Sequence, residues 1–283
     1  MGWKPGEINK KNMIEERQKK ELREKYNPDG SNLRKAQQRM LEMLVFFDDF
    51  CKKNNLRYWL DGGTLLGAIR HQGFIPWDDD IDINMPAEDF TKLVKLFGDK
   101  QIGDYVLQNH DTDPGYYRCW GVLRDLKSKY VHTDDLYSER TIKYKGLQID
   151  IFPVITEYNQ FTFIVSKYLK VLVDHFWKAK LSAFNSFMTK SFYYLGSRLL
   201  YPLFHVLVKK KNNRIVFDYG VGFWRESRYE EDIYPLGKVE FEGHFFNAPK
   251  DPLSYCRKIY GNDCMEMPSP DKIYGHQSIV EFL

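Results

Sequence analysis

A glycine turn is the first part of the sequence whose residue types suit phosphate chemistry. Gly62-Gly63-Thr64 follows a short β-prone stretch and precedes a stretch with helical character. Glycine permits backbone conformations with positive φ and lets N–H groups approach a phosphate, and a helix N-terminus adds partial positive charge. Thr64 can donate one further hydrogen bond. Taken alone, a Gly-Gly-Thr sequence is most often an ordinary turn.

An acidic run over residues 78–82 follows this turn closely. Alternation along a strand would put Asp80 and Asp82 on one face and Ile81 on the other. Two neighbouring carboxylates repel each other unless a cation or a proton lies between them, and Mg²⁺ or Mn²⁺ prefers oxygen ligands. A solvated acidic turn is the alternative, although the alternation with Ile81 and Ile83 favours a partly buried strand.

A lone aspartate, Asp150, lies within the apolar stretch 148–152. A carboxylate in such a strand is costly unless it is hydrogen-bonded or bound to a metal, and taken alone Asp150 fits a hydrogen-bonded core aspartate equally well. Together with the glycine turn and the Asp80–Asp82 pair, however, Asp150 completes a pattern that resembles the three-part site of the nucleotidyltransferase fold.

The surrounding elements must bring these pieces together. Ser31 or Asn32 can cap a helix whose apolar face repeats at steps of three and four, with Met40, Leu44, Phe47 and Cys51. Short β-prone segments and further helices alternate with it up to residue 154. This order predicts an α+β (mixed α/β) fold in which a mixed β-sheet is flanked by helices and a helical insert follows.

Composition divides the chain into four segments. We expect a charged N-terminal helix or arm at 1–30, a catalytic core at 31–156, a basic, aromatic-rich helical segment at 157–218, and a C-terminal segment at 219–283 that packs back on the core. Residues 161–211 contain nine Lys/Arg and one acid. This stretch could lie on an anionic membrane surface or form a helical subdomain that covers the sheet, and the sequence supports both interpretations equally.

The whole-chain composition excludes several classes of protein. The 42 Lys/Arg nearly balance the 39 Asp/Glu, so we expect no stable nucleic-acid partner. The four cysteines form no CxxC pair, which argues against a zinc ribbon or a disulfide framework. The first 25 residues lack an apolar signal region, and no apolar run reaches the length of a membrane span. We therefore expect a cytoplasmic location, with peripheral contact at the inner face of the membrane as an option.

A longer stretch carries a family resemblance. Residues 58–83, Tyr-Trp-Leu-Asp-Gly-Gly-Thr-Leu-Leu-Gly-Ala-Ile-Arg-His-Gln-Gly-Phe-Ile-Pro-Trp-Asp-Asp-Asp-Ile-Asp-Ile, resemble the signature of the LicD family, which includes bacterial phosphocholine transferases and is similar to fukutin and fukutin-related protein. A second block, Tyr260-Gly261 with Met265 or Met267, Pro268 and His276, resembles the C-terminal pattern of the family. The resemblance covers residues 35–155 well and 235–276 thinly.

The resemblance implies a reaction. A LicD-like enzyme would transfer a phospho-alcohol, phosphocholine first, from a CDP-linked donor such as CDP-choline to a hydroxyl of a cell-envelope or lipid-linked glycan, and release CMP. Charge that builds on the phosphate oxygens would be offset by Mg²⁺ or Mn²⁺. The implied catalytic and metal-binding residues are Asp80, Asp82 and Asp150, and Asp150 could instead accept the proton of the attacking hydroxyl.

The donor phosphates would be bound by a second set of residues, namely Gly62, Gly63, Thr64, Arg70 and Arg124. Two other functions remain open. The same site could transfer a nucleotidyl group from an NTP to a small molecule, nucleic acid or protein, or the chain could be a binding or scaffold protein with an inactive site.

Overall fold

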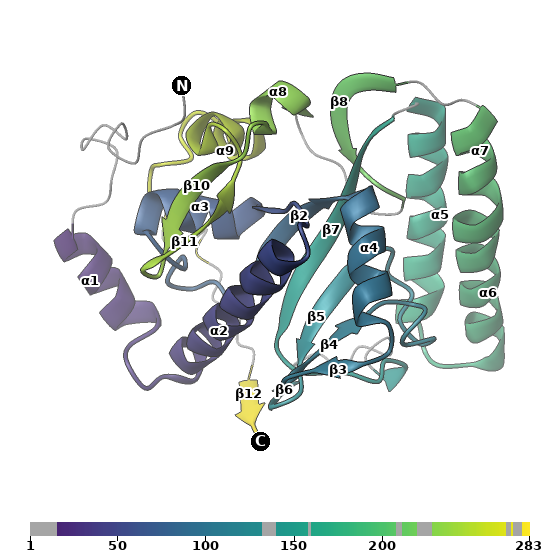
Figure 1. The fold of residues 1–283 in the computed structure, drawn as a ribbon. Helices are drawn as coiled ribbons and strands as arrows, with labels where there is room; N and C mark the ends of the chain where they lie inside the picture. Colours follow the sequence, from purple (N-terminus) through teal and green to yellow (C-terminus); the bar gives the residue numbers. More distant parts are fainter. Residues whose placement is uncertain are drawn as a thin grey trace.

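One mixed β-sheet forms the centre of the computed structural model, which describes residues 16–131, 140–157, 160–207, 211–219, 228–269, 273 and 279–283 (Figure 1). The strands are β1 (Trp59–Leu60), β2 (Asp82–Pro86), β3 (Gln101–Ile102), β4 (Tyr105–Gln108), β5 (Gly121–Asp125), β6 (Ser128–Val131), β7 (Gln148–Glu157), β8 (Lys211–Phe217), β9 (Arg228–Tyr229), β10 (Gly237–Phe241), β11 (His244–Ala248) and β12 (Ile279–Phe282). The helices are α1 (Glu16–Tyr26), α2 (Asn32–Lys53), α3 (Gly62–His71), α4 (Ala87–Phe97), α5 (Gln160–Lys178), α6 (Ala183–Tyr194), the π-helical η3 (Leu195–Leu200), α7 (Tyr201–Leu207), α8 (Glu230–Ile233) and α9 (Pro252–Tyr260).

The central sheet has the strand order β1-β2-β7-β5-β4-β3, and β8 pairs with both β7 and β9. Strands β2 and β7 are parallel, whereas β1–β2, β5–β7, β4–β5 and β7–β8 are antiparallel. Helices α2 and α4 cross one face of the sheet (Figure 1). This mixture of parallel and antiparallel pairs with flanking helices confirms the predicted α+β class.

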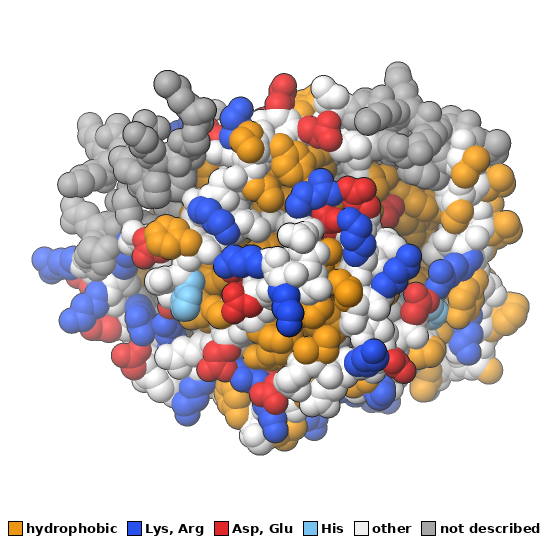
Figure 2. All heavy atoms as spheres, in the orientation of Figure 1, with side chains coloured by type: hydrophobic (Ala, Val, Ile, Leu, Met, Phe, Trp, Pro, Cys, Tyr) orange, Lys and Arg blue, Asp and Glu red, His pale blue; other side chains and the backbone are white. Residues whose placement is uncertain are grey.

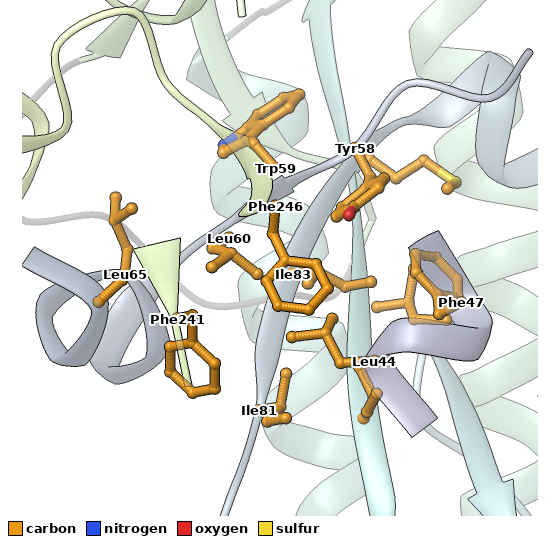
Figure 3. Close-up of a cluster of buried hydrophobic side chains, with 14 of the residues drawn as sticks. Leu44, Phe47, Tyr58, Trp59, Leu60, Leu65, Ile81, Ile83, Phe241 and Phe246 are labelled. Carbon is orange, nitrogen blue, oxygen red and sulfur yellow. The ribbon is translucent and has the colours of Figure 1, made fainter. Parts of the chain in front are cut away.

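Helix α2 forms as its sequence predicts. The Ser31 hydroxyl accepts a hydrogen bond from the backbone N–H of Arg34, which caps the first turn. The predicted apolar face is buried, and its Leu44 and Phe47 lie against Ile81 and Ile83 (Figure 3). Because Ile81 and Ile83 point to α2, the alternating side chain of Asp82 points to the opposite face of the sheet.

The C-terminal part of the chain packs on the same core. The β10–β11 hairpin contributes Phe241 and Phe246 to the cluster beside α3 and β1 (Figure 3). Strand β12 pairs with β6. Strand β8 lies in the central sheet, whereas its residues 211–217 fall within the predicted helical segment. The four-segment division stays a prediction, and residues 1–15 of its first segment lie outside the described residues.

Helices α5, α6, η3 and α7 form a helical hairpin at one side of the sheet (Figure 1). One arm of this hairpin is α5, and the other, antiparallel arm is the run of α6, η3 and α7. They pack on the sheet through a second, smaller cluster that includes Tyr117, Val173, Trp177 and Tyr193. In the part of the chain that the structure describes, no helix is long and apolar enough to cross a membrane.

The packing of α2 on β2 yields a prediction about stability. Leu44 is fully buried at this contact. Leu44→Ala should therefore lower the free energy of unfolding by roughly 2–5 kcal/mol, because it removes buried methyl groups and leaves a cavity. Urea denaturation measures the change. Lys53→Ala, at an exposed position of the same helix, serves as the control and should change stability by less than about 0.5 kcal/mol. A loss below about 1 kcal/mol for Leu44→Ala would contradict the central place of this contact.

Candidate active site

Three carboxylates lie in a row across neighbouring strands. Asp82 of β2 is directly beside Asp150 of β7 in the parallel register. On the other side, the backbone N–H of Asp61, just after β1, donates to the carbonyl of Asp82 at 3.0 Å. Neighbouring residues in such a register share one face of a sheet. The three side chains therefore share the face opposite α2.

The glycine turn is pressed against these acids. Gly62 has φ +55°, a conformation that favours glycine. A Cβ at Gly62 would lie 2.9 Å from Oδ2 of Asp82, and one at Gly63 would lie 2.7 Å from Oδ2 of Asp78. Helix α3 begins at Gly62, so its N-terminal N–H groups and partial positive charge are adjacent to the carboxylates.

Thr64 connects the turn to the acidic strand. Its hydroxyl oxygen accepts a hydrogen bond from the backbone N–H of Asp82 at 2.9 Å, and the side chain is buried. The hydroxyl proton remains able to donate to another oxygen. Thr64 thus fixes the start of β2 relative to the turn.

Mutual repulsion and desolvation govern the protonation of the acidic cluster. Desolvation raises the pKa of Asp82 well above its usual value, and the charges of Asp80, Asp150, Asp61 and Asp78 raise it further. Desolvation and Asp80 likewise raise the pKa of Asp78 to about 8. Strand β2 begins at Asp82, so Asp80 lies in the segment just before it rather than within the predicted strand. Asp80 nevertheless belongs to the cluster.

Asp150 has a different environment from Asp82. Its Oδ1 accepts a hydrogen bond from Nε1 of Trp120 at 3.0 Å, and its Oδ2 accepts one from Nε2 of Gln148 at 3.0 Å. Desolvation raises its pKa, while the charges of Arg118 and Arg124 and these two hydrogen bonds lower it. Positive charge and donors are therefore concentrated at the Asp150 end of the row.

The two arginines predicted to bind phosphate are buried and donate to backbone carbonyls. Arg70 on α3 uses Nη1 to contact the carbonyls of Cys264 and Glu266, both at 3.0 Å. Arg124 on β5 donates to Oε1 of Gln108 at 2.6 Å and to the carbonyl of Gly146 at 2.9 Å. Arg124 is on the Asp150 face of the sheet, whereas Arg70 ties α3 to the C-terminal segment.

The C-terminal block seen in the sequence lies against the site through these contacts. Helix α9 ends at Tyr260, and the Arg70 carbonyl partners flank Met265. His276, the last residue of that block, lies outside the described residues. The hydroxyl of Tyr255 on α9 accepts a hydrogen bond from Nδ2 of Asn84, the next residue on the Asp82 face of β2.

The acidic cluster has the chemistry of a divalent-cation site. Its donors are hard carboxylate oxygens, and Oδ1 of Asp61 is buried without a hydrogen-bond partner. A cation would relieve both the repulsion and this unsatisfied acceptor. Among the described residues, no group of three or more His, Cys, Asp or Glu side chains is already arranged to hold a metal ion. Mg²⁺ is usually bound by one or two carboxylates with substrate phosphates and water, so the donor set fits this cation.

A pocket of about 270 Å³ is connected to Asp150 through Trp120. Trp120, which donates to Asp150, lines it together with Arg118 and three tyrosines from the helical arms and the segment after β8, namely Tyr193, Tyr201 and Tyr219. Arg118 lies over the Trp120 ring with its guanidinium carbon 5.2 Å from the ring centre. The pocket therefore combines aromatic faces with charges of both signs, since Arg118 and Arg198 line it together with Asp111 and Asp218.

Asp61 and Arg118 are not among the site residues predicted from the sequence. Asp61 directly precedes the glycine turn, and its place opposite Asp82 follows from the β1–β2 register. Arg118 lies just before β5 and two residues from Trp120, so the register of β5 against β7 decides its position. Neither register can be read from local residue spacing.

Comparison with known proteins finds a family match over the residues of this site. Residues 55–173 match the model described as LicD/FKTN/FKRP, nucleotidyltransferase domain. The lipopolysaccharide cholinephosphotransferase LicD of Haemophilus influenzae is 25% identical over 258 residues, which cover 83% of this chain and 92% of that protein. The ribitol 5-phosphate transferase FKRP of Homo sapiens is 51% identical over 43 residues, 15% of this chain and 9% of that protein. An uncharacterized protein of Rickettsia typhi is 36% identical over 115 residues, 35% of this chain and 37% of that protein. Residues 55–173, which contain the glycine turn, Asp82 and Asp150, therefore match the nucleotidyltransferase domain of the LicD family.

Proposed function

We propose that the protein transfers a phospho-alcohol, phosphocholine first, from a CDP-linked donor to a hydroxyl of a cell-envelope glycan and releases CMP. One observation carries this proposal: the glycine turn at the N-terminus of α3 lies directly against Asp82 and Asp78. Such a turn can receive a diphosphate, and the acids can share a cation with it. The similarity to a lipopolysaccharide cholinephosphotransferase over 83% of the chain supports the choice of donor and acceptor class.

The proposed reaction balances as a displacement at phosphorus. The acceptor hydroxyl oxygen forms a bond to the phosphorus that bears the alcohol. The bond from that phosphorus to the oxygen shared with CMP breaks, and CMP leaves with the electron pair. The hydroxyl proton passes to a carboxylate, for which Asp150 is suited because its donor Trp120 lines the pocket and its two hydrogen bonds fix its orientation.

The proposed cofactor is Mg²⁺, or Mn²⁺, held by Asp80 and Asp82, with Asp150 as a further ligand in the alternative to its role as base. When bound, this cation would offset charge on the diphosphate. The carboxylate cluster would otherwise repel an anionic donor, since five aspartates, Asp61, Asp78, Asp80, Asp82 and Asp150, influence one another there.

Donor recognition is divided between two ends of the site in this proposal. The N–H groups of Gly62 to Thr64 would bind the diphosphate. The pocket beside Trp120 would take the alcohol, because aromatic faces attract a quaternary ammonium group. Arg118 is better placed than Arg70 for a phosphate contact, since Arg70 already donates to two carbonyls.

The first test measures donor binding with and without the cation. Isothermal titration with CDP-choline in Mg²⁺ should give binding that EDTA abolishes. Asp82→Asn should lose this Mg²⁺-dependent binding, whereas Asp49→Asn, at an exposed position on α2, should bind like the wild type. Asp150→Asn should retain binding within about threefold if Asp150 acts as the base, and should lose it if Asp150 is a ligand.

The same titration separates the alternatives. CDP-ribitol and CDP-glycerol test the choice of alcohol. Binding of CTP in place of every CDP-alcohol would replace the proposal with nucleotidyl transfer. If no nucleotide binds in either condition, an inactive binding protein becomes the better interpretation.

The second test distinguishes Arg118 from Arg70. Arg118→Ala should weaken CDP-choline binding about tenfold, equal to roughly 1.4 kcal/mol, and leave the urea midpoint unchanged. Arg70→Ala should instead lower the free energy of unfolding by about 1–3 kcal/mol, because its buried carbonyl partners lose their donor. A reversed pattern would assign the phosphate contact to Arg70, as the sequence analysis expected.

A further inference from the structure

The helical arms expose an unusually apolar surface. On α5 the exposed apolar side chains recur at steps of three or four residues, and a second series runs along α6, η3 and α7. We define these residues as the outer face: Phe161, Ile164, Tyr168, Val171, Leu172, Phe184, Phe187, Tyr194, Leu195, Leu199, Leu203 and Val206. Phe187 is 65% exposed and Val206 is 76% exposed. A contiguous apolar surface of this kind marks an interaction site.

Both arms turn this face away from the sheet. The inner side of α5 is buried through Leu169, Val173 and Trp177, and the inner side of α6 through Tyr193. Trp177 and Tyr193 both contact Tyr117, with ring centres 5.8 Å and 5.4 Å apart. Successive residues of an α-helix are about 100° apart around its axis, so the outer-face residues of each arm lie on the side opposite its buried residues. The exposed sides of the two arms therefore form one side of the helical hairpin. In Figure 2, hydrophobic side chains gather at the right-hand margin, over α6 and α7.

Basic side chains border the outer face. Residues 160–207 contain six Lys/Arg and one acid, Asp174, which pairs with Lys170 at 2.6 Å. Lys167 and Lys178 are exposed on the flank of α5, and Lys190 is exposed on α6. At the tip between the arms, Lys180 is exposed next to Leu181, which is also exposed.

This combination selects one kind of partner. Lysine is depleted in protein–protein interfaces, whereas a basic border around aromatic and aliphatic side chains matches anionic lipid headgroups above acyl chains. Pairing of two copies through this face would bring two lysine-bordered surfaces together with few acids to neutralise them.

We propose that the outer face docks on an anionic lipid surface, with its aromatic and aliphatic side chains at the headgroup boundary and its lysines on the phosphates. This surface function is independent of the proposed transfer reaction. The inner side of the same arms lines the pocket beside Trp120 through Tyr193, Ser197 and Tyr201. Docking therefore holds that pocket close to the lipid.

Co-sedimentation with vesicles tests the proposal. The full chain should bind vesicles of 30% phosphatidylserine and 70% phosphatidylcholine at 50 mM NaCl, at least tenfold more tightly than pure phosphatidylcholine vesicles, and 500 mM NaCl should weaken binding strongly. The double variant Phe184→Ser/Phe187→Ser should bind at least tenfold more weakly. The matched control Phe245→Ser, which removes an exposed phenylalanine from β11, should bind like the wild type.

Charge is tested separately. Lys180→Glu/Lys190→Glu should remove the preference for phosphatidylserine, and Lys35→Glu on α2 should not. Each variant should retain wild-type thermal unfolding and CDP-choline binding, so that a failure of docking is separate from a failure of the site.

Two results would overturn the proposal. The first is vesicle binding that the Phe184→Ser/Phe187→Ser variant leaves unchanged. The second is absence of vesicle binding together with self-association, seen by analytical ultracentrifugation, that the double variant abolishes, since this would make the face an interface between copies.

Discussion

Repulsion among carboxylates that share one face of three neighbouring strands is the constraint on which the site and its surroundings depend. Asp61, Asp82 and Asp150 are held side by side by backbone register, so they cannot separate without breaking the sheet. The opposite face supplies the compensating stability, because Ile81 and Ile83 are fully buried against α2. Because side chains alternate between the two faces of the sheet, this one segment contributes isoleucines to the core and an aspartate to the site.

The electrostatic surroundings of the aspartates differ between the Asp82 end and the Asp150 end of the row. Desolvation raises the pKa of Asp82 most, and the largest charge effects on it, all from carboxylates, raise it further. At Asp150 two arginines and two hydrogen-bond donors oppose the desolvation. The proposed cation would therefore be favoured most near Asp82, whereas Asp150 accepts a hydrogen bond from Trp120, which lines the neighbouring pocket. This difference is the physical basis on which the proposal separates metal binding from proton transfer.

The features that sequence predicted well are those decided by neighbouring residues. Local spacing predicts the Ser31 cap, the buried face of α2 and the position of Asp82 on the sheet face opposite Ile81. The structure agrees with each. The surroundings of Arg70 could not be predicted in this way. Its partners Cys264 and Glu266 are almost 200 residues away, so helix position alone could not distinguish a phosphate contact from a structural one. The pairing of β8 with β7 is equally non-local, because two helical arms separate the strands.

The helical arms connect the site to the surface of the molecule. Their inner stripe is apolar enough to pack on the sheet, and Tyr193 from it lines the pocket beside Trp120. Their outer stripe is also apolar, and its side chains are exposed. A helix with apolar side chains on two opposite sides is stable only when both sides are shielded from water. Packing on the sheet buries the inner side, and the proposed lipid surface would cover the outer side, with Lys180 and Lys190 next to its headgroups. The same two arms would then form a wall of the pocket and hold it beside the lipid.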